Sequence, residues 1–320
     1  MQTPEWQDLR VTQVNRVAHD VVELRLVSAT SAPLPAWSPG AHVEVETAGG
    51  QIRHYSLCGP ADDAESYTIA VLREPEGRGG SEHLHTAVDV DSIVCVRGPR
   101  NHFELVPGAT DYVLVAGGIG ITPLKAMAEH LQATGQSWRL HYGGRSLSSM
   151  AYVDDLVSLA PASVQVHPED EVGRLDLAAI LSPVGPTTSV YCCGPSGLLD
   201  AATAAVADSA AHDLHLERFT SSAPVAVLHE TGDSFTVELA VSGVEIEIAP
   251  DQSILQAVRS AVPDAPSSCE DGYCGTCETR VLSGTPEHRD TVLTASEQAR
   301  NDTMMICVGR SLSPRLVLDL

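Results

Sequence analysis

The sequence predicts a multidomain chain: an all-β segment, an α/β segment with a doubly wound parallel sheet, and a third segment built around a cysteine cluster. Three observations carry this prediction. Short alternating runs separated by Gly and Pro occupy the first part, apolar runs alternate with helical stretches in the middle, and three cysteines cluster near the end. The length of 320 residues also fits two or three domains.

The first segment, residues 1–107, contains short runs that favour β-strands, and turn residues separate them. The expected strands cover residues 21–27, 42–46, 67–73 and 92–97. Many short strands at this spacing predict a sandwich or a barrel.

The second segment, residues 108–219, begins with an apolar run at 112–116 that is typical of a strand buried on both faces of a parallel sheet. Further strands are expected at 138–142 and 189–192, and helices at 123–133, 152–159 and 198–207. This alternation of strands and helices predicts the doubly wound fold. Residues 220–232 are expected to form a linker, and the third segment covers 233–320, with strands at 235–239, 244–248 and 279–282 and a helix at 254–260.

Composition narrows the function and the location. The sequence has no apolar run long enough for a membrane span and no signal peptide, so a cytoplasmic location is expected. A formal net charge of −23 argues against nucleic acid as a partner, because phosphate contacts require surface Lys and Arg. The charge fits a partner with a basic patch, and equally an acidic proteome that keeps its proteins in solution.

Four cysteines form the strongest motif of the sequence: Cys269, Cys274, Cys277 and Cys307. The first three have the spacing of plant-type [2Fe–2S] ferredoxins. Gly272 and Gly275 allow the sharp turns that bring backbone N–H groups toward the sulfurs. The alternative is a structural zinc site, which usually has two CxxC pairs, whereas only one is present here. The remaining cysteines are expected to be core thiols, except for Cys193.

A glycine-rich turn follows the apolar run at 112–116 and contains Gly117, Gly118 and Gly120. Thr122 and Pro123 then open a helix, whose N-terminus favours a pyrophosphate. The alternative is an ordinary tight turn between a strand and a helix, since the GxGxxG fingerprint is absent.

Two further motifs lie in the first segment. In the first, Arg53 offers a phosphate partner, Tyr55 a flat packing surface and Ser56 a hydrogen bond to a ring heteroatom, although an ordinary strand explains these residues equally well. In the second, a loop with Gly79, Gly80 and Ser81 offers backbone N–H groups to a phosphate, or is a flexible hairpin turn.

The order of these motifs resembles that of the phthalate dioxygenase reductase family, which includes vanillate demethylase reductase subunits and belongs to the ferredoxin–NADP reductase superfamily. The resemblance covers essentially the whole chain. It rests on Arg53-x-Tyr55-Ser56-Leu57, Gly79-Gly80-Ser81, Gly117-Gly118-x-Gly120-x-Thr122-Pro123, Tyr191-x-Cys193-Gly194-Pro195 and the four cysteines of the ferredoxin motif.

The resemblance implies an FMN-binding antiparallel β-barrel, a nicotinamide-binding α/β domain and a C-terminal α+β ferredoxin-like β-grasp domain. It assigns Arg53, Tyr55 and Ser56 to the flavin and Gly79, Gly80 and Ser81 to the FMN phosphate. It places Gly117, Gly118, Gly120, Gly194 and Pro195 at the nicotinamide cofactor. Thr122, Cys193 and Phe219 would be catalytic: Thr122 between the two cofactors, Cys193 beside the nicotinamide and Phe219 over the flavin. The alternatives are a buried strand thiol for Cys193 and a hydrophobic anchor of the linker for Phe219.

The function implied by the resemblance is an NAD(P)H-dependent flavin and iron–sulfur oxidoreductase. Electrons would pass from NADH through FMN and the [2Fe–2S] cluster to a Rieske-type oxygenase or a cytochrome P450. Arg145 and Ser146 leave NADPH open as a donor, with NADH favoured. Two rival functions are a stand-alone flavin reductase with a structural metal site and an iron–sulfur carrier without nicotinamide turnover.

Acidic residues near the cluster, Glu270, Asp271 and Glu278, offer a rim for docking the acceptor or form a solvated loop.

Overall fold

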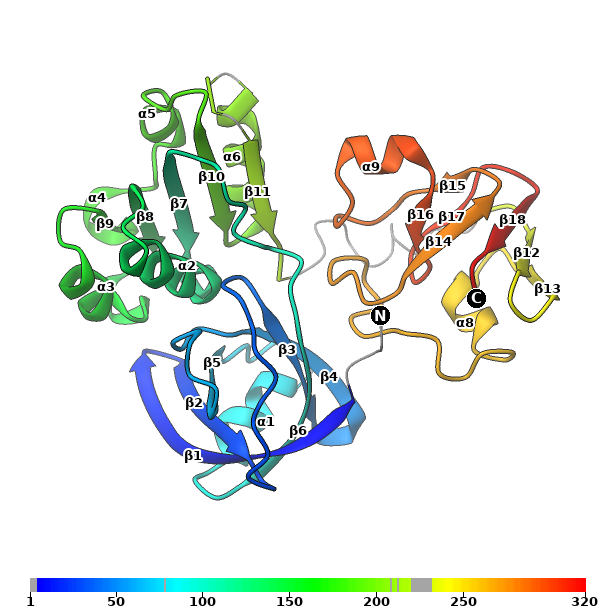
Figure 1. The fold of residues 1–320 in the computed structure, drawn as a ribbon, viewed down its shortest axis with the longest axis horizontal. Coiled ribbons are helices and arrows are strands. Elements are labelled where there is room, and N and C mark those ends of the chain that lie inside the picture. The colour runs from blue at the N-terminus through cyan, green and yellow to red at the C-terminus, as the bar shows by residue number, and fades with distance from the viewer. Residues whose placement is uncertain (1–4, 78, 208, 212, 220–231) are drawn as a thin grey trace. The chain divides into compact units, whose positions relative to one another are not determined.

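A computed structural model of the chain describes residues 5–77, 79–207, 209–211, 213–219 and 232–320. The chain forms two compact units, Met1–Glu217 and Arg218–Leu320, and Figure 1 shows their elements. The first unit contains both an antiparallel and a parallel sheet and is not divided further. The predicted domain boundary between residues 107 and 108 therefore stays a prediction. Residues 220–231 of the predicted linker lie outside the described residues.

An antiparallel sheet of six strands forms the beginning of the first unit. Its strands are β1 (Trp6–Ala18), β2 (Val21–Ser28), β3 (His42–Thr47), β4 (Gln51–Ser56), β5 (Ser66–Leu72) and β6 (Ile93–Arg100). They follow the order β4-β3-β6-β1-β2-β5, and a bridge between Leu57 and Ile69 joins the two ends of this order. The sheet therefore closes into a barrel, with η1 (Ala48–Gly50) between β3 and β4 and helix α1 (Gly80–Thr86) between β5 and β6.

The barrel forms because its strands alternate apolar and polar side chains. In β2, Leu24 and Leu26 are fully buried, whereas Glu23 and Arg25 are only partly covered. Burial of each such leucine contributes roughly 1.5–3 kcal/mol. Leu9 of β1 belongs to the same core, although β1 itself was not among the predicted strands.

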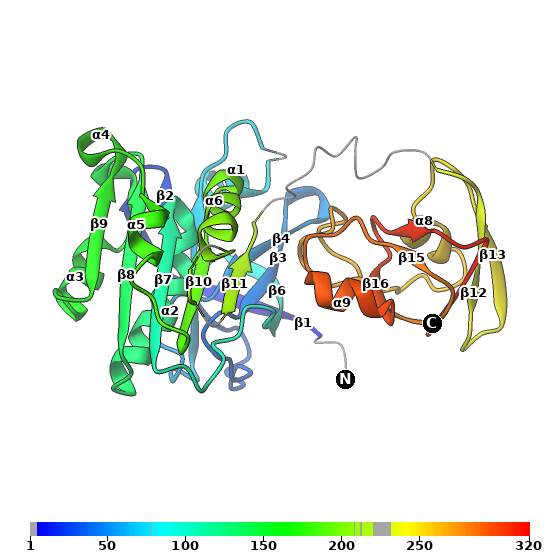
Figure 2. The same cartoon turned by 90° about the horizontal axis from the view of Figure 1, so that it is seen from above.

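A parallel sheet of five strands forms the rest of the first unit. Its strands are β7 (Asp111–Gly117), β8 (Trp138–Gly144), β9 (Val164–Pro168), β10 (Thr188–Cys193) and β11 (Asp213–Glu217). The helical elements are η2 (Gly118–Gly120), α2 (Ile121–Ala133), η3 (Leu147–Ser149), α3 (Val153–Leu159), α4 (Glu169–Val172), α5 (Leu177–Leu181) and α6 (Ser196–Ala207). All strand pairs are parallel, and Figure 2 shows the five strands side by side.

The strand order is β11-β10-β7-β8-β9, so the direction of winding reverses between β7 and β10. One face of these strands packs on α5 and α6 through a core that includes Val113, Val190, Leu177 and Leu199. This is the doubly wound fold that the alternation of apolar strands and helices predicts, and ligands of such sheets bind where the winding reverses.

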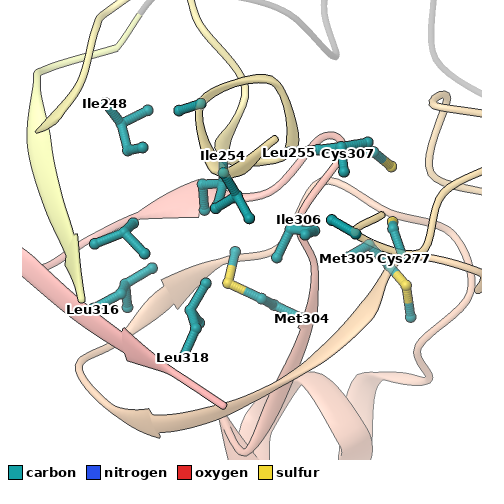
Figure 3. Close-up of a cluster of buried hydrophobic side chains, with 14 of the residues drawn as sticks. Ile248, Ile254, Leu255, Cys277, Met304, Met305, Ile306, Cys307, Leu316 and Leu318 are labelled. Atoms are coloured by element: carbon teal, nitrogen blue, oxygen red, sulfur yellow. The ribbon is translucent and has the colours of Figure 1, made fainter. Parts of the chain in front are cut away.

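The second unit is an α+β fold around a mixed sheet. Its elements are β12 (Phe235–Leu239), β13 (Val244–Ile248), α8 (Ile254–Val258), β14 (Glu278–Ser283), β15 (Pro286–Glu287), α9 (Ala295–Arg300), β16 (Thr303–Met305), β17 (Arg310–Ser311) and β18 (Arg315–Leu318). The strand order is β13-β12-β18-β14-β16, with β12 and β18 parallel. Figure 3 shows Ile254 of α8 above Leu316, Leu318 and Met304, in a core that extends to Cys277 and Cys307.

Most predicted elements are present, and the differences are local. Strands β12 and β13 have the predicted bounds, whereas β9 and β18 were not predicted. Helix α3 begins at Val153 instead of Tyr152, because Tyr152 has a left-handed backbone with φ 62°. Gly80 and Ser81, predicted in a loop, are the first residues of α1. In the described part of the chain, no helix has both the length and the apolar composition needed to cross a bilayer.

Candidate cofactor sites

The turns after β7 and β10 meet where the winding of the parallel sheet reverses. A Cβ atom on Gly120 would lie 2.2 Å from the carbonyl oxygen of Cys193, and one on Gly117 would lie 2.8 Å from Cδ of Pro195. Only glycine allows this approach of the two backbones. Gly117, Gly118, Gly120, Gly194 and Pro195, which the sequence predicts as nicotinamide ligands, are therefore brought together at this edge of the sheet.

Helix α2 begins directly after this turn. The N–H of Ile121 donates to the carbonyl oxygens of Gly118 and Ile119, and Pro123 has no N–H, so the glycine turn and the positive end of the helix are what suit this edge to a pyrophosphate. Thr122 is buried, and its hydroxyl donates to the carbonyl oxygen of Ile119 at 3.0 Å. The Thr122 side chain thus fixes the shape of the turn that faces the ligand.

A second cradle lies at the edge of the barrel, between β4 and the start of α1. A Cβ on Gly80 would lie 2.8 Å from Cγ of Arg53 and 3.2 Å from Oγ1 of Thr47. Gly79 has a φ of 88°, and the hydroxyl of Ser81 accepts from the backbone N–H of Glu74 at 3.0 Å. The Arg53 side chain therefore crosses the bare backbone at Gly80, which brings a guanidinium beside a glycine turn, a combination that can bind a phosphate.

The Arg53 guanidinium is already oriented within this cradle. Its Nη1 donates to the carbonyl oxygen of Ile52 at 2.8 Å, and its Nη2 donates to Oε1 of Gln51 at 2.6 Å. Tyr55, two residues further along β4, is half-buried against the barrel core. These positions fit a phosphate at Arg53 and a flat ring against Tyr55.

Three polar side chains from distant parts of the first unit converge between the two cradles. The Cys193 thiol donates to Oε2 of Glu217 at 3.9 Å, and the Ser56 hydroxyl lies close enough to lower the pKa of the same carboxyl. Ser56 is 4% exposed, and its oxygen completes no geometric hydrogen bond within the described residues. An incompletely bonded, buried hydroxyl beside Tyr55 fits hydrogen bonding to a flavin ring.

Burial dominates the electrostatics of this group. It raises the pKa of Glu217 to about 8, against smaller lowering effects from Cys193 and Ser56. Burial and the neighbouring Glu217 raise the pKa of Cys193 well above its ordinary value. At neutral pH Cys193 is therefore a neutral thiol, and Glu217 carries a proton that it can exchange.

The four cysteines of the ferredoxin motif converge in the second unit, and all are at most 7% exposed. They lie as two pairs, because the side chain of Cys269 contacts Cys274 and that of Cys307 contacts Cys277. In the described part of the chain, no three His, Cys, Asp or Glu side chains are grouped to hold a metal ion. Two thiol pairs fit a cluster with two irons, each iron held by one pair.

The loop between the first two cysteines turns its backbone toward the sulfurs. The N–H of Asp271 donates to Sγ of Cys269 at 3.4 Å, and the N–H of Gly272 is directed at the sulfur of Cys307. Gly272 has a φ of 72°, and a Cβ there would lie 2.7 Å from Cγ2 of Val308. The expected role of this glycine is therefore confirmed in its geometry.

Comparison with known proteins decides the family. A family model of the 2Fe-2S iron-sulfur cluster binding domain matches residues 237–311. The carnitine monooxygenase reductase subunit of Escherichia coli (strain K12) is 38% identical over an alignment of 320 positions, which covers 98% of this chain and 98% of that protein. A solved structure of phthalate dioxygenase reductase is 36% identical, with a match that covers 98% of each chain and a TM-score of 0.72. This chain belongs to the phthalate dioxygenase reductase family.

A solved structure of an intact type IV self-sufficient cytochrome P450 monooxygenase is also similar. It is 43% identical with a TM-score of 0.91, and the match covers 98% of this chain but 41% of the P450 chain. As a family member, the chain is an oxidoreductase of the flavin and [2Fe–2S] electron-transfer type, and it works with a nicotinamide cofactor and an oxygenase.

The site of this family member includes one residue that the sequence analysis did not select, Glu217. The signal available was its place in Glu217-Arg218-Phe219, at the end of the run that forms β11. Phe219 is half-buried and lies in the second unit, so its role over the flavin stays a prediction. The catalytic roles of Thr122 and Cys193 likewise stay predictions.

Of the predicted acidic rim, one carboxylate pairs with a cation and a second accepts a hydrogen bond from a hydroxyl. Glu270 pairs with Arg259 at 2.5 Å, and Oε1 of Glu278 accepts from the Thr303 hydroxyl at 2.9 Å.

Proposed function

We propose that this chain takes hydride from NADH at FMN and delivers single electrons through its [2Fe–2S] cluster to a separate terminal oxygenase. The observation that carries the proposal is the meeting of Ser56, Cys193 and Glu217. It brings the end of the flavin strand β4 to the end of the nicotinamide strand β10 within one unit. Hydride transfer requires the two cofactor sites to lie close together, because the reacting atoms must approach to about 3–3.5 Å.

The cofactors supply the chemistry, since a flavin accepts two electrons as hydride and releases them singly to a one-electron cluster. The chain supplies binding and orientation. In this proposal, Arg53, Gly79, Gly80 and Ser81 hold the FMN phosphate, and Tyr55 and Ser56 hold the ring.

The nicotinamide cofactor is held at the turns after β7 and β10. Gly117, Gly118 and Gly120, with the start of α2, receive the pyrophosphate. Thr122 shapes this turn, and Cys193 borders the nicotinamide as a neutral, uncharged surface. Glu217 holds a proton beside the Ser56 hydroxyl, which allows the site to take up or release one proton as the flavin changes its charge.

The cluster is held by the two thiol pairs, Cys269 with Cys274 and Cys277 with Cys307. Backbone N–H groups at Asp271 and Gly272 stabilise negative charge on the sulfurs, which raises the cluster's affinity for an electron.

The acceptor in this proposal is a Rieske-type oxygenase or a cytochrome P450, as in systems to which the relatives belong. A cytoplasmic location is supported by the eight cysteines, all of which are free thiols in the structure.

Cys274→Ser tests the order of the carriers. The variant is expected to lose reduction of a protein acceptor, such as a cytochrome, while NADH-dependent reduction of ferricyanide at the flavin stays within about twofold of wild type. Cys95→Ser, which removes a thiol of the barrel, is the matched control and should retain both activities. Loss of both activities in a folded Cys274→Ser protein would show that the flavin does not precede the cluster.

A further inference from the structure

A buried polar network joins the barrel to the parallel sheet and belongs to none of the cofactor sites. We call it the clasp, and its members come from β2, the residues after β4, helix α2 and the residue before α3. They are Glu23, Cys58, Lys125, Glu129 and Tyr152.

Lys125 is the centre of the clasp. The residue is 8% exposed, and its Nζ donates to the carbonyl oxygen of Cys58 at 2.9 Å and to Oε1 of Glu129 at 2.6 Å. Cys58 lies two residues beyond Ser56 of the flavin strand, and Lys125 lies three residues beyond Thr122 of the nicotinamide turn. The ammonium group of Lys125 therefore connects the residues that follow the flavin strand β4 to helix α2, which follows the nicotinamide turn.

Tyr152 forms the second half of the clasp. Its hydroxyl donates to Oε2 of Glu23 at 2.8 Å and lies 3.5 Å from Sγ of Cys58, while Nζ of Lys125 lies 5.2 Å from the centre of its ring. The backbone of Tyr152 is left-handed, with φ 62°, which is unfavourable for a bulky residue. Such a conformation persists only where the surroundings hold it in place.

A backbone contact fixes the same loop to the barrel. The N–H of His19, in the turn between β1 and β2, donates to the carbonyl oxygen of Ser148 at 2.7 Å. The loop from Ser146 to Tyr152 is thus attached to the barrel at two points, although it follows the second strand of the parallel sheet, β8.

The polar composition of the clasp indicates that it fixes the orientation of the two sheets more than it stabilises the fold. Apolar side chains of equal volume would hold the two sheets together as well or better, because burying an ammonium and partly burying two carboxylates has a desolvation cost. Hydrogen bonds are directional, so a network that bonds residues of both sheets favours one arrangement of the parts that it joins. The Cys58 thiol contributes a contact only, since burial raises its pKa to about 12.

We propose that Lys125 and Tyr152 are positioning residues for hydride transfer, which hold the nicotinamide turn at a fixed distance and angle from the flavin strand. The inference rests on the proposed function, because it concerns the geometry of that reaction. Neither side chain touches the reacting atoms in this account. Their loss relaxes the approach of the two cofactors, and a displacement of about 1 Å can reduce such a rate by about 100-fold.

The test uses the full-length holoprotein with Lys125→Met, which keeps the length of the side chain, and Tyr152→Phe, which removes only the hydroxyl. Tyr67→Phe is the matched control, because the buried Tyr67 hydroxyl donates to the Pro35 carbonyl entirely within the barrel. Anaerobic stopped-flow mixing with NADH gives the limiting rate of flavin reduction and the Kd for NADH separately. NADH deuterated at the transferred position gives the isotope effect.

We expect Lys125→Met to lower the limiting rate about tenfold and Tyr152→Phe to lower it about threefold, with FMN content and the Kd for NADH unchanged. The isotope effect should become more temperature-dependent in both variants, which a merely structural role would not cause. Tyr67→Phe should match wild type in all these values.

Wild-type rates and isotope effects in folded Lys125→Met and Tyr152→Phe would overturn the inference. So would losses that Tyr67→Phe shares. If Lys125→Met does not fold, Tyr152→Phe decides the question alone. Failure of NADH to reduce the flavin of the wild-type protein would instead overturn the proposed function, and the inference with it.

Discussion

At the scale of single residues, the acid–base behaviour of Glu217 is set by contacts that the fold creates, and its neighbours in the sequence do not account for it. Its carboxyl meets Cys193 from the adjacent strand and Ser56 from the barrel, and this burial raises its pKa from the ordinary value of 4.5 to about 8. Between these two values the folded protein holds a proton that the unfolded chain has released. The contribution of Glu217 to stability is therefore present at low pH and declines as pH rises through this window.

Glu217→Gln is expected to remove that pH dependence, because the amide does not titrate. The variant should be more stable than wild type, by a margin in unfolding free energy that grows by roughly 3–4 kcal/mol between about pH 5 and about pH 8, with a matching rise in its relative melting temperature. Differential scanning calorimetry at several pH values measures it. A constant difference between the two proteins across that range would show that Glu217 titrates normally.

Gly120 gives a prediction at the same scale. In Gly120→Ala the new methyl would overlap the Cys193 carbonyl, so the two turns must separate, at a cost of about 1–3 kcal/mol. FMN content should remain, while NADH-driven flavin reduction falls by at least about tenfold. Gly197→Ala on α6 is the control, because a Cβ there meets nothing within 4 Å and should leave the rate unchanged. Equal rates of flavin reduction in Gly120→Ala and Gly197→Ala would show that the nicotinamide cofactor does not bind at this turn.

At the scale of elements, the acidic helix α4 bears on the choice of nicotinamide. The backbone N–H of Asp170 donates to the carbonyl oxygen of Arg145, so α4, with Glu169, Asp170 and Glu171, lies beside the position where a 2′-phosphate would sit. The Arg145 side chain is exposed and would attract that phosphate, but the carboxylates of Asp170 and Glu171 oppose it, while Glu169 lies 4.0 Å from Arg174.

We therefore expect kcat/KM for NADH to exceed that for NADPH by at least about tenfold, a difference of about 1.4 kcal/mol in binding the transition state. Steady-state assays with both cofactors measure the ratio. Asp170→Asn together with Glu171→Gln should reduce it, and a wild-type preference for NADPH would contradict this account of α4.

Elements whose local pattern matches their environment could be predicted from the sequence. Strands β12 and β13 alternate strictly and have the predicted bounds, and the apolar run 112–116 within β7 is buried on both faces. Strand β1 was missed because its polar residues obscure the alternation, and only pairing with β2 and β6 makes it a strand. The start of α3 was misplaced because the left-handed backbone at Tyr152 depends on contacts with the barrel, more than 90 residues away in sequence.

At the scale of the whole molecule, the motifs fix the order of the cofactor sites but not the contacts among them. The cysteine spacing predicted the cluster, because all but one of its ligands lie in one loop. The meeting of Ser56 with Glu217 joins residues 161 positions apart in the sequence. No local pattern records such a contact, and the same holds for the clasp. A site whose residues lie in one loop can be predicted from the sequence, whereas contacts between residues of two sheets are found only in the folded structure.

The central claim is that one chain carries electrons from NADH through a flavin to a [2Fe–2S] cluster. The visible absorption spectrum of freshly purified protein, before and after anaerobic addition of NADH, tests it most directly. We expect overlapping flavin and iron–sulfur bands that both bleach when NADH is added. A flavin spectrum with no cluster contribution, together with the absence of iron on metal analysis, would contradict it.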